Sequence, residues 1–154
     1  MRAVVQRVRS ARVTVGGEET GAIGLGLLVY LGVTHEDTTE EARWLARKLA
    51  ELRVFDPPAH LEPGGAERSL LDVGGAALVV SQFTLYGDAR QGRRPAFTGA
   101  LEPAAARALY EESLLQIAAA GVTRVAAGEF AADMAVELVN DGPVTILLDS
   151  RKVF

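Results

Sequence analysis

The sequence contains no cysteine and little histidine, so several common kinds of catalytic and metal site are excluded. Without cysteine there can be no disulfide, thiolate nucleophile or cysteine-based metal centre. The histidines, His35 and His60, both stand in polar, loop-like sequence, and we expect them at the surface rather than in a Ser-His-Asp triad. No HExxH spacing occurs, and no glycine-rich phosphate loop carries a lysine. We therefore expect neither a metal nor an organic cofactor.

Long apolar runs are also missing. The longest run extends from Ala22 to Val33, which is too short to cross a bilayer. The N-terminal residues include Arg2, Gln6 and Arg7, unlike the apolar core of a signal peptide. We expect a cytoplasmic protein without membrane contact. A length of 154 residues and a hydrophobic content of 49% predict one domain over residues 1–154 with a substantial core.

The net charge of −4 is unlike that of a general nucleic-acid-binding domain, and we expect no DNA partner. An acidic protein can still hold one end of an RNA through a local basic patch. Two groups of arginines could form such a patch, or could be ordinary solvated surface residues. One is Arg90, Arg93 and Arg94, and the other is Arg2, Arg7, Arg9 and Arg12.

Apolar periodicity predicts about seven strands and two helices. The first helix begins at a capping box formed by Thr38 and Glu41, and the second runs from Glu102-Pro103 to about Ala120, before Gly121. Strands are expected over residues 3–15, 23–33, 53–55, 77–86, 122–127, 134–139 and 144–148. Because the strands come in runs rather than alternating with helices, we expect an α+β fold. Its sheet should be largely antiparallel and β-barrel-like, with the two helices packed outside.

Two segments contain residues that a buried strand rarely tolerates. The first, Ser81-Gln82-Phe83-Thr84-Leu85, puts polar side chains directly after an apolar strand. In the second, Gly142-Pro143 directly precedes the apolar residues that begin at Val144. Local rules are most often broken at functional sites, so these segments are candidates for the active site.

The first segment, continued as a strand, would direct alternate side chains to opposite faces. Ser81, Phe83 and Leu85 would lie on one face, and Gln82, Thr84 and Tyr86 on the other. The hydroxyl groups could simply bind nearby backbone. Thr84 could act as a nucleophile only with an adjacent base, and the sequence offers none. The alternative is a site of backbone amides and carbonyls that Ser81, Gln82 and Thr84 shape.

The two segments together resemble the signature motifs of the D-aminoacyl-tRNA deacylases, homodimeric enzymes that hydrolyse D-amino acids off tRNA. Five further segments in the same order extend the resemblance over nearly the whole chain. They are residues 1–8, 26–29, 52–55, 94–97 and 147–150. The resemblance implies a β-barrel-like domain with external helices, in agreement with the pattern of strands.

The resemblance also implies roles for particular residues. Ser81, Gln82, Phe83 and Thr84 would form one wall of the active site. Gly142-Pro143 would be a cis pair that enters the neighbouring subunit's site, hold the substrate ammonium and exclude L side chains, so that glycine would also be accepted. Arg7 would lock this pair, and Phe97 and Met134 would lie near the pocket. The implied substrate is the acceptor end of a tRNA that carries a D-amino acid or glycine.

Three segments depart from the family pattern. Phe130-Ala131-Ala132 stands where Phe-Gly-Ala is usual, residues 59–68 lack a common Lys-Met-Asn stretch, and Ala96 replaces a usual serine. These departures concern substrate preference more than the type of reaction. Two other interpretations remain open at this stage. One is a non-catalytic module that binds an amino acid or an RNA end, and the other is a conventional serine or threonine esterase.

Overall fold

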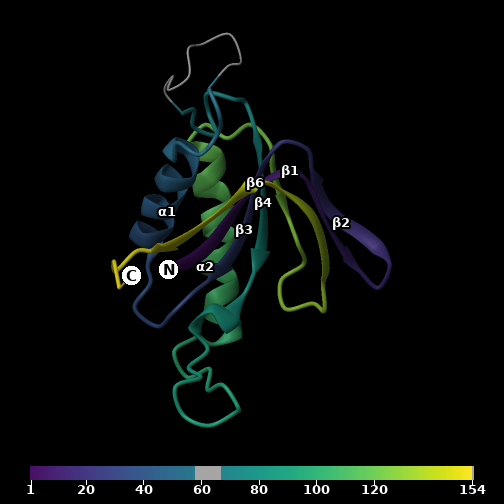
Figure 1. Cartoon of the computed structure of the whole chain (residues 1–154). Helices are drawn as coiled ribbons and strands as arrows, with labels where there is room; N and C mark the ends of the chain where they lie inside the picture. Colours follow the sequence, from purple (N-terminus) through teal and green to yellow (C-terminus); the bar gives the residue numbers. More distant parts are fainter. Residues whose placement is uncertain (58–66, 154) are drawn as a thin grey trace.

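The computed structural model describes residues 1–57 and 67–153, and Figure 1 shows their arrangement. His60 and most of the loop predicted over residues 56–68 lie outside the described residues. The strands are β1 (Arg2–Val15), β2 (Glu18–Ile23), β3 (Gly26–Gly32), β4 (Ala76–Ser81), β5 (Val125–Ala127) and β6 (Ala135–Asp149). The helices are α1 (Thr39–Glu51), α2 (Pro103–Ala119) and a short 3-10 helix, η1 (Phe83–Tyr86).

The strands form one mixed sheet that curves until its ends meet. Its order is β2-β1-β3-β4-β5, and β6 pairs with β1. β1 is antiparallel to β2, β3 and β6, whereas β3–β4 and β4–β5 are parallel. At the closure, a Cβ added to Gly21 of β2 would lie 2.6 Å from the Ala127 carbonyl oxygen of β5, and Arg124 donates to the Ala22 carbonyl at 2.9 Å. The predicted α+β, barrel-like class is confirmed.

Two apolar clusters account for the burial pattern of the central strands. One cluster lies between the sheet and the helices and includes Val29 and Val79. The other lies inside the curved sheet and includes Leu28 and Leu78. Because β3 and β4 are buried on both faces, their sequences are continuously apolar rather than alternating. Figure 1 shows α1 and α2 side by side on the same side of the sheet.

The helix ends agree with the prediction. Thr38 and Glu41 form the capping box of α1, in which the Thr38 hydroxyl accepts from the Glu40 N–H at 3.2 Å. In α2, Glu102 is the N-cap and Pro103 occupies the first turn. Gly121, just beyond the end of α2, has a φ of +102°, a conformation that favours glycine.

The strand boundaries differ from the prediction in several places, and the described residues hold six strands rather than about seven. Residues 53–55 do not form a strand, because only Phe55 makes an isolated bridge, to Arg68. The run predicted over 23–33 is broken at Gly24-Leu25, where the chain turns from β2 into β3. The two strands predicted over 134–139 and 144–148 are the single strand β6.

Candidate active site

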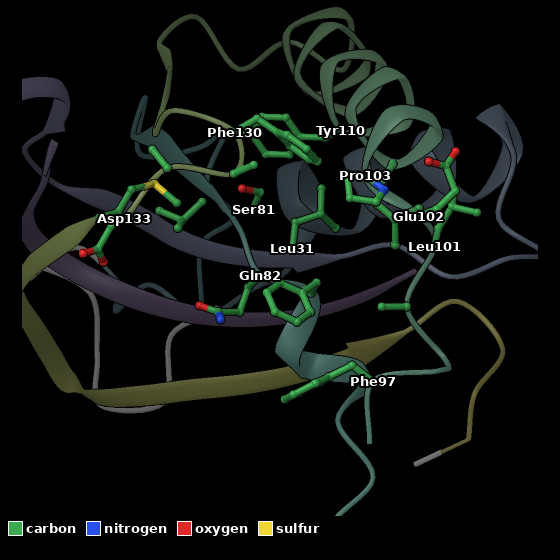
Figure 2. Close-up of a pocket in the computed structure, with 18 of the residues that line it drawn as sticks. Leu31, Ser81, Gln82, Phe97, Leu101, Glu102, Pro103, Tyr110, Phe130 and Asp133 are labelled. Atoms are coloured by element: carbon green, nitrogen blue, oxygen red, sulfur yellow. The ribbon is translucent and has the colours of Figure 1, made fainter. Parts of the chain in front are cut away.

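A pocket of about 600 Å³ opens where β4 ends and α2 begins. Figure 2 shows residues around it from the ends of β3 and β4, from the segment that leads from Phe97 into α2, and from the turn that precedes β6. Most of the lining is apolar and aromatic. The aromatic residues are Phe83, Phe97, Tyr110 and Phe130. A mainly apolar concavity with a few polar groups is typical of a small-molecule site.

The first motif passes from strand to 3-10 helix within the pocket wall, so the predicted strand over residues 77–86 is wrong beyond Ser81. The Gln82 N–H still donates to the Leu31 carbonyl of β3 at 2.7 Å, but the chain then turns, and the Leu85 N–H donates to the Gln82 carbonyl at 3.3 Å. The predicted division of the motif into two faces therefore fails. Ser81, Gln82 and Phe83 all line the pocket.

Thr84 does not line the pocket, and its environment is not that of an activated nucleophile. Its hydroxyl accepts a hydrogen bond from the Gln82 side-chain amide at 2.5 Å. An amide cannot take a proton from a hydroxyl at neutral pH, so this contact orients Thr84 without activating it. The first hydrogen bond of η1 begins at Leu85, so the N–H groups of Phe83 and Thr84 precede it and remain available as donors at the helix start.

Aromatic contacts build the mouth and the floor of the pocket. Phe83 and Phe97 pack edge to face, with ring centroids 5.1 Å apart, and are 57% and 38% exposed. Tyr110 is buried and packs on Phe130 with ring centroids 5.6 Å apart, and its hydroxyl donates to the Val79 carbonyl at 2.9 Å. Burial raises the pKa of Tyr110 to about 12. Tyr110 is therefore a neutral structural donor at physiological pH.

Ala131 lies on the pocket wall in an unusual backbone conformation. Its φ is +63°, in the left-handed region that favours glycine. The Ala132 N–H donates to the Glu129 carbonyl at 3.2 Å, so Ala131 occupies the third position of a tight turn. A turn with positive φ at that position usually carries glycine there. The same turn leads into Met134, which also lines the pocket.

The second motif lies outside the pocket of its own chain. Gly142 and Pro143 are exposed in the middle of β6, and the peptide bond between them is cis, as the resemblance implied. Neither residue lines the pocket, and neither does Arg7. Within one chain the structure therefore groups Ser81, Gln82, Phe83, Phe97 and Met134, and separates them from Gly142, Pro143 and Arg7.

Arg7 holds the second motif in place from beneath. The buried guanidinium donates through Nε to the Asp141 carbonyl at 3.2 Å and through Nη1 to the Val54 carbonyl at 2.5 Å. It also pairs with the Asp141 carboxylate at 3.2 Å. A Cβ added to Gly142 would lie 2.9 Å from Arg7 Nη2, so the arginine packs directly against a residue that must lack a side chain.

Two further residues fix the segment around Asp141. The Asn140 side chain donates to the Arg7 carbonyl at 2.9 Å and to the Val144 carbonyl at 3.1 Å, and so joins the two sides of the motif. A hydrogen bond from Arg9, together with the charges of Arg7 and Arg9, lowers the pKa of the Asp141 carboxyl. Gly142-Pro143 is thus presented to solvent on a well-supported backbone.

The remaining candidates take no part in the pocket. His35 is exposed and contacts the Thr98 carbonyl at 3.0 Å. Within residues 1–57 and 67–153, no group of three potential metal ligands is found. The helices described there are all too short or too polar to span a membrane. Tyr110 is not predicted from the sequence, because the apolar face of α2 gives no sign that it reaches the pocket, whereas the replacement of a usual glycine singles out Ala131.

Comparison with known proteins identifies the family. Residues 4–149 match the family described as D-Tyr-tRNA(Tyr) deacylase. The chain belongs to this family. A protein named D-aminoacyl-tRNA deacylase from Anaeromyxobacter dehalogenans is 58% identical over 154 residues, which cover 100% of both chains. Another of that name, from Thermus aquaticus, is 56% identical over 152 residues, covering 99% of this chain and 97% of the relative.

Solved structures of two proteins share this family's fold. The c-Myc DNA Unwinding Element Binding Protein superimposes with a TM-score of 0.87 and 41% identity, over 97% of this chain and 98% of the other. A probable eukaryotic D-amino acid tRNA deacylase superimposes with a TM-score of 0.79 over 96% and 97% of the two chains. Its identity is 20%, so the second likeness concerns the fold alone.

Proposed function

We propose that the protein hydrolyses the ester bond of D-aminoacyl-tRNA and releases a D-amino acid and free tRNA. Membership of the deacylase family supports the reaction. The observation that carries the proposal in the structure is the first motif, which turns into a 3-10 helix at the pocket wall and leaves the N–H group of the lining residue Phe83 ahead of the first helical hydrogen bond. The pocket volume of about 600 Å³ suits an amino acid esterified to a terminal nucleoside.

The chemistry requires no side-chain nucleophile. Water attacks the ester carbonyl, and the N–H group of Phe83, which lines the pocket, stabilises the oxyanion of the tetrahedral intermediate. The C–O bond to the ribose then breaks, the ribose oxygen takes up a proton, and the free carboxylic acid leaves. An aminoacyl ester is already activated, so electrostatic stabilisation and positioning of the water suffice. Thr84→Ala should therefore keep substantial activity, because the Thr84 hydroxyl takes no part in the reaction.

Selection of the D-isomer is assigned to Gly142-Pro143 from the other subunit of a homodimer. Proline has no N–H and glycine has no side chain, so the pair presents backbone carbonyl acceptors to the substrate ammonium. Once the ammonium and the ester carbonyl are fixed, an L side chain would point into this backbone, whereas a D side chain would point away. Glycine has no side chain to exclude, so glycyl-tRNA should also be hydrolysed.

Two features of the chain support the homodimer. Gly142-Pro143 is exposed and outside its own pocket, and Arg7, Asn140 and Asp141 nevertheless hold it firmly. Leu147 on the same strand and Phe83 at the pocket mouth are each 57% exposed, which is unusual for large apolar side chains unless a partner covers them. A monodisperse monomer with full activity would contradict the homodimer.

The decisive experiment measures release of labelled amino acid from matched D-tyrosyl-tRNA and L-tyrosyl-tRNA, with catalytic amounts of enzyme and added chelator. Rapid multiple turnover on the D form alone is expected. Stoichiometric binding without turnover would instead support the non-catalytic module, and loss of all activity in well-folded Thr84→Ala would support a threonine nucleophile. Equal hydrolysis of both isomers would exclude the assigned role of Gly142-Pro143.

Subunit mixing tests the cross-subunit assignment directly. Gly142→Ala should be inactive because its φ is +113° and the new Cβ would lie 2.9 Å from Arg7 Nη2. Ser81→Phe should be inactive because it fills the pocket. Each mixed dimer would combine an intact pocket with an intact Gly142, so an equal mixture should recover about a quarter of the wild-type activity. No recovery after verified subunit exchange would place both motifs in the same subunit's site.

A further inference from the structure

The loop of residues 88–96, called here the arginine loop, extends away from the rest of the molecule (Figure 1). Two backbone hydrogen bonds close its base: the Asp88 N–H donates to the Ala96 carbonyl at 2.7 Å, and the Ala96 N–H donates to the Asp88 carbonyl at 2.9 Å. Phe97, which follows directly, lines the pocket and packs on Phe83. The loop is therefore fixed to the edge of the proposed active site.

The three arginines of the loop differ in their electrostatic surroundings. Arg90 makes a bidentate pair with Asp88, at 2.8 Å from Nε to Oδ1 and 2.6 Å from Nη2 to Oδ2. Hydrogen bonds from Arg90 hold the pKa of Asp88 well below its usual range. Arg93 and Arg94 are exposed, and neither has an acidic partner within 4.0 Å among the residues that the structure describes. The loop thus presents two uncompensated positive charges.

The second group of arginines identified in the sequence is neutralised instead. Each of its members pairs with a carboxylate at 3.2 Å or less. The pairs are Arg2–Asp149, Arg7–Asp141, Arg9–Asp141 and Arg12–Glu137. Of the two candidate patches, the arginine loop is therefore the one whose charge remains available to an external anion.

We propose that the arginine loop binds the phosphate backbone of the tRNA acceptor end through Arg93 and Arg94, while Asp88 withholds Arg90 from that contact. The proposal rests on the proposed function, which puts the esterified nucleoside in the pocket and the preceding phosphates outside it. Guanidinium groups match the geometry of phosphate oxygens. Phosphate contacts fix position without reading sequence, as an enzyme acting on many different tRNAs requires.

The test measures binding of fluorescently labelled uncharged tRNA against salt concentration, for the wild type and for Arg93→Gln/Arg94→Gln. Each lost phosphate contact lowers the slope of log K against log salt by about 0.9 on a duplex. Between 50 and 200 mM salt, the wild type should therefore lose roughly tenfold more affinity than the double variant. The matched control is Arg47→Gln/Lys48→Gln, which removes the same charge from exposed positions on α1. An equal effect in the control would overturn the proposal.

Asp88→Asn provides a test in the opposite direction, which a misfolded variant cannot imitate. Loss of the carboxylate frees Arg90 to bind a phosphate, so tRNA binding should become stronger. The slope of log K against log salt should steepen by the amount expected for about one further phosphate contact. Unchanged or weaker binding by a folded Asp88→Asn protein would show that Asp88 does not restrain the loop.

Turnover of a minimal substrate separates this proposal from the proposed function. Arg93→Gln/Arg94→Gln should hydrolyse the D-tyrosyl ester of adenosine as fast as the wild type, while KM for D-tyrosyl-tRNA rises. Equal losses on both substrates would place the loop in the chemistry and refute a phosphate contact. A wild type inactive on every ester, with the expected tRNA-binding slopes, would refute the proposed function and support the loop. If the wild type is active but the substitutions in the loop leave tRNA binding unchanged, the proposed function is supported and the role of the loop is refuted.

Discussion

We expect the replacement of Ala131 by glycine to stabilise the protein, which is the opposite of the usual effect of glycine on stability. Ala131→Gly should stabilise the protein, although replacing alanine by glycine normally costs about 0.5–1 kcal/mol through the greater freedom of the unfolded chain. The reason is the φ of +63° at the third position of the turn from Glu129 to Ala132. A residue with a Cβ costs about 1–2 kcal/mol in this region, and glycine avoids the cost.

The two effects can be combined into an expected magnitude. Relief of about 1–2 kcal/mol in the folded state, less about 0.4–1 kcal/mol of added freedom in the unfolded state, leaves a gain of roughly 0.5–1 kcal/mol. For a chain of this length the melting temperature should rise by about 1–4 °C. Urea unfolding followed by circular dichroism would give the free energy, and differential scanning calorimetry would give the melting temperature.

Ala132→Gly is the matched control, because Ala132 is the neighbouring residue and its φ is not positive. It should destabilise the protein by about 0.5–1 kcal/mol. If both variants lose stability equally, the left-handed conformation at Ala131 carries no cost and the reasoning is wrong. Ala131→Gly also removes a methyl group from the pocket wall, so turnover of bulky D-aminoacyl-tRNAs should be measured alongside.

Three further predictions concern buried polar groups. Arg7→Lys should lose about 2 kcal/mol of stability in urea and weaken discrimination between D- and L-aminoacyl-tRNA, because an ammonium cannot hold Asp141 and the neighbouring carbonyls together. Asp37→Asn should cost about 3 kcal/mol in the same assay, since it leaves the buried Met1 ammonium, now 2.5 Å from Asp37 Oδ1, without its counter-ion. Tyr110→Phe should lower the free energy of unfolding by about 1 kcal/mol at pH 7, because the hydrogen bond to the Val79 carbonyl is lost. When unfolding is measured at increasing pH, the variant and the wild type should become equally stable at about pH 11.

The direction of the Tyr110 effect follows from its raised pKa. Burial favours the neutral phenol, so the pKa of Tyr110 is about 12 in the folded protein, whereas a tyrosine in the unfolded chain has a pKa of about 10. The stabilising contribution is complete below about pH 10 and is lost as the pH rises toward 12, at about 1.4 kcal/mol per pH unit. A constant difference in stability between the wild type and the Tyr110→Phe variant over this range would contradict it.

Glu36→Gln is the control for Asp37→Asn. Glu36 is exposed and pairs with Arg151 at 2.9 Å, so its substitution should cost no more than about 1 kcal/mol. If Glu36→Gln and Asp37→Asn were equally harmful, burial of the Met1 pair would not be the cause. If Arg7→Lys is measurably destabilised but still discriminates between D- and L-aminoacyl-tRNA as the wild type does, Arg7 supports the fold but does not position Gly142-Pro143.

The parts of the fold that the sequence predicts correctly are those with a local physical cause. Thr38 and Glu41 specify the start of α1, and Pro103 that of α2, because capping and the first turn depend on neighbouring residues. The break in the first motif at Gln82 has no such cause. The Gln82 N–H still bonds to the Leu31 carbonyl as a strand residue would. The chain then turns into a helix where Phe83 packs on Phe97, and this contact is distant in the sequence.

The site is likewise only partly visible in the sequence. Polar residues after an apolar run indicated Ser81 and Gln82, and a Gly-Pro before β-branched residues indicated the second motif. Tyr110 could not be found, because a tyrosine on the apolar face of a helix looks like any core residue until its hydroxyl is seen on the Val79 carbonyl. The neutralisation of Arg2, Arg9 and Arg12 depends on β6 lying beside β1, a pairing between opposite ends of the chain.

That pairing has a consequence for how the protein is made. β1 leaves the ribosome before the other described strands, yet its partner along one whole edge is β6, with Arg2 opposite Asp149. At about 5–20 residues per second, the nascent chain would wait roughly 8–30 s before this edge could be covered. During that interval a long strand with unpaired backbone groups is open to contacts with other nascent chains. The sheet can be completed only after β6 has been synthesised, so a chaperone that shields β1 should raise the yield more than one that acts on the completed chain.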